Sequence, residues 1–333
     1  MRHIVAFLIV VGLIAGGTPA QRSEGAPAPE KTTLSIGTSV RDIGFLNVYV
    51  ADAKGFFKNE GLAVKLLYFR GSGEAVPALA GGAVDLLADS FTTAIDAYVA
   101  GQPLKAIWSV SNIPAYQIYA RREIKTVQDL RGKKIAVSGI GALSHLITIY
   151  MLQRGGLSDA DRSVQYLAVG GPNDRLAALR AGRVDAIPST VPGSYLLEEE
   201  GYTQLLDLRH LVKEFQYESL TAKNDFVNAN PNTVRAVLRA LIRAGYFIRR
   251  SPVESADILN KIINFPGAQR GLTVRAVSEV LADFPLDGHF AEGSVDVFLG
   301  FYKQMGHLKT VPRHDAIIDY RFIREFEEHP VHP

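Results

Sequence analysis

Hydroxyl groups, carboxylates and glycines gather in six short segments that each follow a strand-like stretch and lead into a helix-like one. The segments are residues 39–45, 71–74, 89–93, 138–145, 170–174 and 189–195. Backbone N–H groups at a helix start favour a bound anion, and hydroxyls and carboxylates orient a ligand by hydrogen bonding. The pattern predicts a site for a small polar molecule. The residues that we expect to contact it are Ser39, Asp42, Phe45, Gly71, Ser72, Gly73, Asp89, Ser90, Phe91, Ser138, Gly141, Ser144, His145, Asn173, Thr190 and Tyr195.

The strongest local pattern is Ser-Gly-Ile-Gly-Ala-Leu-Ser-His at residues 138–145. A dinucleotide fingerprint needs a third glycine where Ser144 stands, and an acidic residue after the next strand, which the sequence lacks near Val169. We therefore expect no cofactor and favour an anion-binding loop. The structural alternative is an ordinary tight turn, with His145 hydrogen-bonded to the backbone.

Other members of the set also have structural alternatives. Asp174 follows a Gly-containing turn and is expected to cap its helix rather than bind a ligand. Phe91 and Tyr195 stand at helix starts, where they either wall a ligand or pack in the core.

Catalytic and metal-binding patterns have little support in this chain. The sequence contains no cysteine, no G-x-S-x-G motif and no H-E-x-x-H spacing, and its eight histidines are scattered. Asp42, Glu74 and Asp89 could converge as carboxylates, but the sequence defines no acid–base pair. We expect no metal and no catalytic residues.

Residues 64–85 and 164–185 repeat one another at an offset of one hundred positions. Each copy runs from a strand through a Gly-containing loop into a helix, and then to a Val-Asp pair whose aspartate is expected to make turn hydrogen bonds. This period is too long for a solenoid, so it predicts two similar α/β lobes with a ligand cleft between them. Ser90 and Thr190 follow equivalent strands, and their hydroxyls are expected to face one another across the cleft.

Length and composition agree with a two-domain globular protein. The chain has 333 residues, of which 47% are hydrophobic and 21% charged, and its length exceeds what one core usually supports. A formal net charge of +2 argues against nucleic-acid binding, because such proteins carry a basic patch or stripe.

The N-terminus is typical of an export signal. Residues 4–15 form an apolar run after Arg2 and His3, and small residues follow as far as Ala20, where we expect cleavage. The run is shorter than the ~20 residues that span a bilayer. Residues 1–20 are therefore assigned as a cleavable signal peptide, residues 21–31 as a flexible spacer, and the protein as exported.

The remaining chain divides by pattern. Strand-like and helix-like segments alternate over residues 34–121 and again over residues 127–208, which predicts mostly parallel sheets covered on both faces. Beyond residue 222 the pattern becomes helical. Pro231 and Pro252 occupy favoured first-turn positions, with Asn230 as a cap.

Five stretches carry a family resemblance. They are residues 43–46 (Ile-Gly-Phe-Leu), 51–62 (Ala-Asp-Ala-Lys-Gly-Phe-Phe-Lys-Asn-Glu-Gly-Leu), 80–85 (Ala-Gly-Gly-Ala-Val-Asp), 127–137 (Val-Gln-Asp-Leu-Arg-Gly-Lys-Lys-Ile-Ala-Val) and 179–185 (Leu-Arg-Ala-Gly-Arg-Val-Asp). The chain resembles the NMT1/THI5-like solute-binding proteins, which serve ABC importers for sulfonates, nitrate, taurine and thiamine-precursor pyrimidines. The likeness spans about residues 34–225. The cysteine-containing motifs of the enzymatic branch are missing from this sequence.

The resemblance implies a type II periplasmic binding protein of the α/β class. In that fold two lobes, each with a mostly parallel sheet and flanking helices, enclose a ligand cleft. The chain is expected to cross between lobes near Ala120 and near Thr221. Residues 32–120 with 222–333 would then form the first lobe, and residues 121–221 the second.

We expect the solute-binding component of an ABC importer that captures a small organic anion of the sulfonate, nitrate, carboxylate or pyrimidine type. The resemblance places its acidic group near Ser144 and His145. The expected partners are this anionic or heteroaromatic ligand and an inner-membrane ABC permease, with no nucleic acid, and the chain is expected to be a monomer. Two alternatives on the same scaffold are a periplasmic enzyme that uses Asp42, Asp89 and His145, and a sensory ligand-binding protein.

Overall fold

The computed structural model describes most of the chain after the N-terminal segment. The described residues are 27–112, 116–212, 216–264, 270–281, 284–290 and 292–331. The expected signal peptide, its cleavage position after Ala20 and most of the spacer therefore lie outside them. Within this part, every helix is too short or too polar to cross a membrane.

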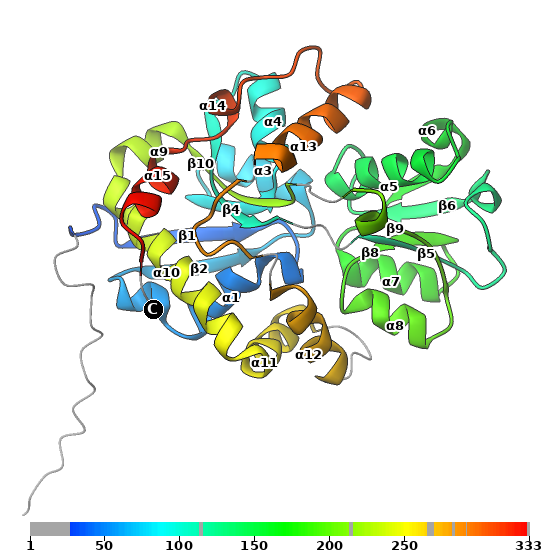
Figure 1. The fold of residues 1–333 in the computed structure, drawn as a ribbon, viewed down its shortest axis with the longest axis horizontal. Coiled ribbons are helices and arrows are strands. Elements are labelled where there is room, and N and C mark those ends of the chain that lie inside the picture. The colour runs from blue at the N-terminus through cyan, green and yellow to red at the C-terminus, as the bar shows by residue number, and fades with distance from the viewer. Residues whose placement is uncertain are drawn as a thin grey trace, which may run out of the picture.

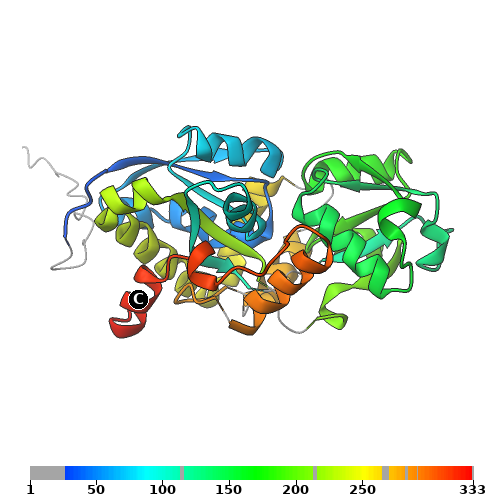
Figure 2. The same ribbon diagram turned by 90° about the horizontal axis from the view of Figure 1, so that it is seen from above.

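Two lobes lie side by side, and each is built around a five-stranded sheet (Figures 1 and 2). The first sheet has the order β2 (Ala63–Tyr68), β1 (Thr33–Thr38), β3 (Leu86–Ser90), β10 (Glu218–Lys223) and β4 (Leu104–Ser111). The second has the order β7 (Gln165–Ala168), β6 (Lys134–Val137), β8 (Ala186–Ser189), β5 (Gln117–Ala120) and β9 (Thr203–Asp207). Strand β10 is antiparallel to both its neighbours, and so is β5. The predicted pair of mostly parallel sheets is confirmed, with one reversed strand in each.

The repeated sequence segments form equivalent parts of the two sheets. The first copy covers β2, α3 and the approach to β3, and the second covers β7, α7 and the approach to β8. Asp85 accepts a hydrogen bond from the Ser35 amide at 2.9 Å, and Asp185 accepts one from the Lys134 amide at 2.9 Å. Each aspartate therefore ties the start of one strand to its neighbour, as predicted for turn residues.

The chain crosses between the lobes earlier than expected on both occasions. Strand β5, predicted as part of the first lobe, pairs with β8 and β9 in the second sheet, so the first crossing precedes it rather than lying near Ala120. Strand β10 pairs with β3 and β4, so the second crossing precedes it rather than lying near Thr221. Each is the reversed strand of its sheet, and the order of segments along the chain does not reveal which sheet such a strand joins.

Helices cover both faces of the two sheets (Figure 1). The first sheet carries η1 (Ile43–Phe45), α1 (Leu46–Ala53), α2 (Phe56–Asn59), α3 (Ser72–Ala80) and α4 (Thr92–Val99). The second carries η2 (Gln128–Leu130), α5 (Leu143–Arg154), α6 (Ala160–Ser163), α7 (Pro172–Arg180), α8 (Gly193–Glu199) and η3 (Leu208–His210).

The C-terminal helices pack on the first lobe. They are α9 (Asn224–Ala229), α10 (Pro231–Arg250), α11 (Pro252–Ile263), α12 (Arg270–Glu279), α13 (Glu292–Gln304), α14 (His314–Ile317) and α15 (Arg321–Glu328). Helix α10 lies against α1 and α2, where buried Glu60 pairs with Arg239 and Arg243. Helix α15 places Phe326 edge-on to Trp108 at 5.8 Å, an aromatic contact typical of a core. The helix starts at Pro231 and Pro252 are as predicted, whereas α14 and α15 were not anticipated.

Two details at the start of α10 differ from expectation. Asn230 does not cap the helix, because its side chain donates back to the Phe226 carbonyl at 3.0 Å. The cap is supplied by Glu30, whose carboxylate accepts from the amides of Asn232 and Thr233 at 3.1 and 2.9 Å. The end of the expected spacer is therefore fixed to the first lobe.

Candidate ligand site between the lobes

A small polar cavity lies where the carboxyl ends of the parallel strands of both sheets meet. It is lined by Ser39, Val40, Asp42, Ser72, Asp89, Ser90, Tyr116, Ser138, Leu143, Ser144, Pro172, Arg175, Tyr217 and Glu218. Open α/β sheets bind ligands at this edge. The cavity encloses about 30 Å³, room for roughly two water molecules. The two lobes therefore lie close together at this point and leave little free space between them.

Three helices begin at the wall of this cavity. They are α3 at Ser72 from the first lobe, and α5 at Leu143 and α7 at Pro172 from the second. The unpaired backbone N–H groups of a helix start attract negative charge. In the first turn of α5, the Ser144 hydroxyl accepts from the Ser138 amide at 2.8 Å, which holds the Gly-containing loop against the helix.

Asp89 is one of three buried carboxylates that the described residues contribute to the cavity wall. Its oxygens accept hydrogen bonds from the Ser90 amide at 2.7 Å, the Thr93 hydroxyl at 2.7 Å and the Ser72 hydroxyl at 3.0 Å. Burial raises the pKa of Asp89, and these hydrogen bonds oppose the rise. The first lobe therefore supplies hydrogen-bond donors that compensate for the burial of this carboxylate.

Asp42 links the two lobes. One oxygen accepts from the Gly44 amide at 2.9 Å and caps η1, and the other accepts from the Thr190 hydroxyl of the second lobe at 2.8 Å. Burial raises the pKa of Asp42, while the hydrogen bonds and the charge of Arg175 act in the opposite direction. Thr190 thus faces Asp42, whereas Ser90 pairs with Thr92 in its own lobe.

Glu218 differs from both aspartates. It is the first residue of β10 and is 4% exposed, yet its Oε2 has no hydrogen-bond partner among the described residues. Burial raises the pKa of Glu218 well above its ordinary value, and the nearby carboxylates of Asp89 and Asp42 raise it further. A hydrogen bond from the neighbouring Tyr217 side chain acts in the opposite direction. Oε2 of this carboxyl group is therefore held in the wall without a partner among the described residues.

Among the described residues, Arg175 is the one cationic side chain in the cavity wall. It is 2% exposed, and its Nε and Nη1 donate to the carbonyls of Pro188 and Gly170 at 3.3 and 3.2 Å. These bonds fix a positive charge at the start of α7. A buried guanidinium held in this way is suited to an acceptor or anionic group on a ligand.

Tyr116 and Tyr217 line the cavity beside the two chain crossings. Their rings meet edge to face with centroids 5.7 Å apart, and both side chains are buried. The cavity therefore combines charged groups with an aromatic wall.

The structure divides the predicted site residues into groups. Those brought into the cavity wall are Ser39, Asp42, Ser72, Asp89, Ser90, Ser138 and Ser144. Gly71 and Gly73 lie at an adjoining cavity of about 230 Å³ at the mouth of the cleft, which Ser72 and Ser138 also line. A Cβ at Gly71 would approach the Ser138 carbonyl to 3.6 Å, so the loops of the two lobes lie in near contact there.

Four predicted residues contribute to packing or local geometry instead. Phe45 is fully buried in the core, and the Phe91 ring packs on Phe290 and Phe298, each 5.6 Å away. His145 does not line the cavity, because its Nδ1 accepts from the Gly141 amide at 3.1 Å. Burial lowers the pKa of His145. The backbone-bonded alternative for this histidine is confirmed, and Asp42, Asp89 and His145 do not form a cluster.

Asn173, Thr190 and Tyr195 bridge the lobes rather than line the cavity. Asn173 donates to the Ile263 carbonyl at the end of α11 at 2.7 Å. Asp174, beside it, accepts from the Gly171 amide at 3.2 Å, which confirms its predicted capping role.

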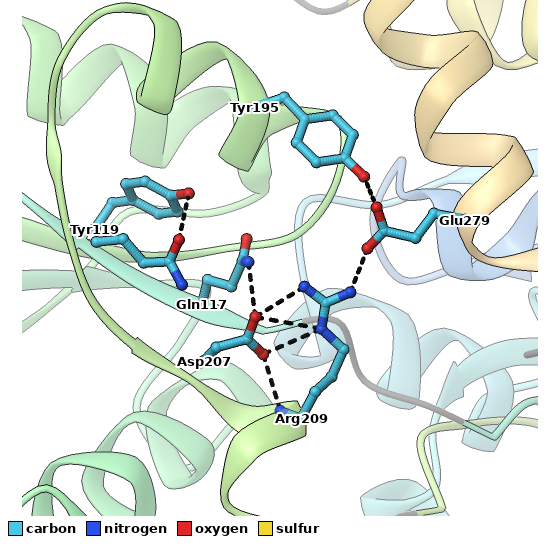
Figure 3. A network of polar contacts seen from close by, with 7 residues as sticks. Gln117, Tyr119, Tyr195, Asp207, Arg209 and Glu279 are labelled. Carbon is cyan, nitrogen blue, oxygen red and sulfur yellow. Dashed lines mark hydrogen bonds and ion pairs between the residues drawn. The ribbon is translucent and has the colours of Figure 1, made fainter.

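Tyr195 belongs to a polar network between α8 and α12, which we call the interlobe clasp (Figure 3). Glu279 of α12 binds both the Tyr195 hydroxyl and the Arg209 guanidinium of η3. Asp207 accepts from Arg209 at 2.8 Å and from Gln117 at 2.9 Å. The clasp holds a C-terminal helix of the first lobe against the second.

The sequence analysis missed four polar or aromatic residues of the cavity wall, for two different reasons. Tyr116, Tyr217 and Glu218 flank the chain crossings, which were placed a few residues too late, so these residues were not expected at the cleft. Arg175 lies within the repeated helix, where a charged residue usually faces solvent. Correct placement of the crossings would have indicated the first three, because a crossing segment must pass the cleft.

The described residues contain no group of three or more His, Cys, Asp or Glu side chains arranged to hold a metal ion. The cavity can bind a polar molecule by hydrogen bonds and charge. It presents acceptors on the first lobe, and a cation with helix N-termini on the second.

The lobes and the cleft between them define the chain as having the periplasmic binding protein fold. Residues 42–255 match the family described as NMT1/THI5 like, and the chain belongs to this family. The riboflavin-binding protein RibY of Chloroflexus aurantiacus is 26% identical over 265 residues, covering 76% of this chain and 74% of that protein.

Two solved structures show how widely the fold is used. The alkanesulfonate-binding protein SsuA from Xanthomonas axonopodis pv. citri, bound to MOPS, has a TM-score of 0.70 and 20% identity, covering 87% of this chain and 99% of that chain. The desulfurization enzyme DSZB has a TM-score of 0.64 and 14% identity, covering 90% and 99%. At these identities the likeness establishes the fold alone.

Proposed function

We propose that this protein is the solute-binding component of an ABC importer, which captures a small polar molecule between its lobes and presents the closed form to a membrane permease. The observation that carries the proposal is a polar cavity whose wall is complete only when both lobes meet. The first lobe contributes Asp42 and Asp89, the second contributes Arg175 and Ser144, and Thr190 bonds across the gap to Asp42.

Family membership and the names of the relatives support this function. RibY is named for binding riboflavin and SsuA for binding alkanesulfonates, so both compounds are candidate ligands for this chain. The signal-like residues 1–20 fit export to the periplasm, where such a component meets its permease.

Binding would proceed by rotation about the two chain crossings. In the open form the ligand contacts one lobe, and closure then adds the helix starts and side chains of the other. Because most contacts exist only in the closed form, the ligand stabilises closure by its preferential affinity for that form.

Native mass spectrometry of the purified protein tests the function. We expect a one-to-one complex that releases an unmodified small molecule on denaturation, and a smaller radius of gyration by X-ray scattering when that molecule is added back. Release of a chemically altered product would favour an enzyme. Failure to find a retained molecule, together with the absence of any stabilisation by riboflavin, nitrate and ethanesulfonate, would reject the proposal.

A further inference from the structure

The three carboxylates of the cavity differ in how the protein satisfies them. Asp89 receives hydrogen bonds from several groups of its own lobe, and Asp42 receives them from Gly44 and Thr190. Oε2 of Glu218 receives none from the described residues. Several other described oxygens also lack partners, but among them Glu218 alone is a carboxylate and alone lines the cavity.

Packing holds Glu218 in this position. A Cβ at Gly44 would meet the Glu218 Cγ at 3.2 Å and the Tyr217 ring at 3.3 Å, so η1 closes tightly over the side chain. Strand β10 lies between β3 and β4, which fixes the backbone from both sides. The carboxylate therefore has little freedom to turn away and find water.

A buried carboxylate oxygen with no donor is strongly unfavourable unless the group takes up a proton or that oxygen meets a donor. Arg175 does not supply that donor in the observed arrangement, because its Nε and Nη1 donate to the carbonyls of Pro188 and Gly170. The missing donor is then expected from the ligand.

The second-lobe side of the cavity favours a hydrogen-bond acceptor or an anion, whereas Glu218 favours a donor. Arg175 lies there with the starts of α5 and α7, all of which favour an acceptor or an anionic group. The aromatic wall of Tyr116 and Tyr217 is suited to a flat face between these two ends.

Building on the proposed function, we infer that the ligand is a flat molecule with an N–H or O–H donor for Glu218 and an acceptor for Arg175. Glu218 is then the residue that determines specificity. It selects donor-bearing heteroaromatic compounds over anions that carry no donor, such as nitrate and ethanesulfonate, and so narrows the anion class expected from the sequence.

Glu218→Gln tests this inference by isothermal titration calorimetry with four probes: riboflavin, 4-aminopyrimidine, nitrate and ethanesulfonate. We expect the wild type to bind at least one of the first two, and Glu218→Gln to weaken that binding by tenfold or more, because an amide offers one acceptor oxygen in place of two. Glu254→Gln is the control, because this exposed first-lobe residue pairs with Lys54 and lines neither cavity, and it should leave affinity unchanged.

The alternative is a protonated Glu218 that donates to an anion, and it makes the opposite prediction. Binding of nitrate or ethanesulfonate that survives in Glu218→Gln would overturn the ligand class and leave the import function intact. If the wild type binds neither riboflavin nor 4-aminopyrimidine, the inference is also rejected. The proposed function is tested separately, by native mass spectrometry. Thermal unfolding of each variant verifies that it is folded.

Discussion

Some polar side chains in the cleft are hydrogen-bonded within the protein, and others are available to bind a ligand. Asp42 and Asp89 are acceptors for hydroxyls and amides of the chain itself, so their burial is compensated. Glu218 and Arg175 line the same cavity from opposite lobes. Oε2 of Glu218 has no hydrogen-bond partner among the described residues. The polarity of the site therefore follows from these two side chains.

Ser144→Asp tests the second-lobe end of the cavity. A carboxylate in the first turn of α5 is favoured by the helix dipole, so the variant should fold with a similar Tm. It would, however, place a fourth acidic group in the wall, at the end where Arg175 favours an acceptor. We expect at least a tenfold loss of affinity, measured by calorimetry with the ligand that native mass spectrometry identifies.

Asn224→Asp in the first turn of α9 is the matched control, since it adds the same charge at a helix start outside the cavity. Its affinity should equal that of the wild type. Unchanged binding by folded Ser144→Asp would exclude Ser144 from the ligand site.

Asp207 makes the stability of the fold depend on pH, and the sign of this dependence follows from its hydrogen bonds. Burial acts to raise its pKa, but hydrogen bonds from Arg209 and Gln117 outweigh burial and hold the pKa below its ordinary value. Such a group stabilises the fold above its unfolded pKa of about 3.9, and this contribution is lost as the pH falls through the folded value. Asp207→Asn should therefore cost about 1–3 kcal/mol at pH 7 and progressively less below about pH 3.9.

Urea denaturation at pH 7, 5 and 3 measures this effect. Asp52→Asn is a control of opposite sign, because burial raises the pKa of Asp52. Its ionised form is disfavoured in the fold, so Asp52→Asn should gain stability at pH 7 and lose that gain as the pH falls. Parallel pH profiles for Asp207→Asn and the wild type would contradict the assigned role of Arg209.

Among the elements, the C-terminal helices have two roles. Helices α10 and α15 complete the core of the first lobe, whereas α11, α12 and α13 reach the second. Phe301 of α13 meets Tyr150 of α5 edge-on at 5.0 Å, on a helix pair distinct from that of the clasp. These helices therefore flank the cleft and help to set how far the lobes close.

Gly288 tests how the segment before α13 packs. A Cβ there would lie 1.9 Å from the Trp108 ring, and the residue has a φ of +67°, which disfavours any side chain. We expect Gly288→Ala to cost roughly 2–4 kcal/mol from overpacking and backbone strain, measured by urea denaturation.

Gly271→Ala in α12 is its control, because nothing lies within 4 Å of a Cβ at that position. That change should be neutral or stabilise the helix by up to about 1 kcal/mol. Equal stability of Gly288→Ala and the wild type would show that this segment does not lie against Trp108.

At the scale of the whole molecule, closure rests on contacts distributed around the cleft. Thr190 bonds to Asp42 beside the cavity, Asn173 reaches α11, and Glu279 joins α12 to α8 and η3 (Figure 3). Each of these polar contacts contributes little free energy compared with the packing of a hydrophobic core. Contacts with a ligand can therefore shift the equilibrium between open and closed forms.

Glu279→Ala removes the centre of the clasp. We expect the ligand-free variant to populate the open form more, which enlarges its radius of gyration, and to bind ligand two- to tenfold more weakly because closure is less favourable. Small-angle X-ray scattering and calorimetry measure the two effects. Glu254→Ala breaks an ion pair within the first lobe and should change neither; identical scattering for Glu279→Ala and the wild type would disprove the clasp.

Local patterns in the sequence determined much of this protein. The hundred-residue offset identified two similar lobes, and the loops after their strands predicted the serines and aspartates that line the cavity. Helix boundaries at Leu143, Pro231 and Pro252 also follow from neighbouring residues. These features are local, since capping, periodicity and proline geometry act over a few residues.

Only the tertiary structure decided which sheet the reversed strands β5 and β10 join, because strand pairing depends on segments far apart in the chain. That choice moved the crossings and brought Tyr116, Tyr217 and Glu218 to the cavity. It also decided that Asn173, Thr190 and Tyr195 bridge the lobes rather than line the cavity. Whether a polar side chain meets a ligand or the facing lobe depends on how two separately folded surfaces fit together, and no local pattern contains that information.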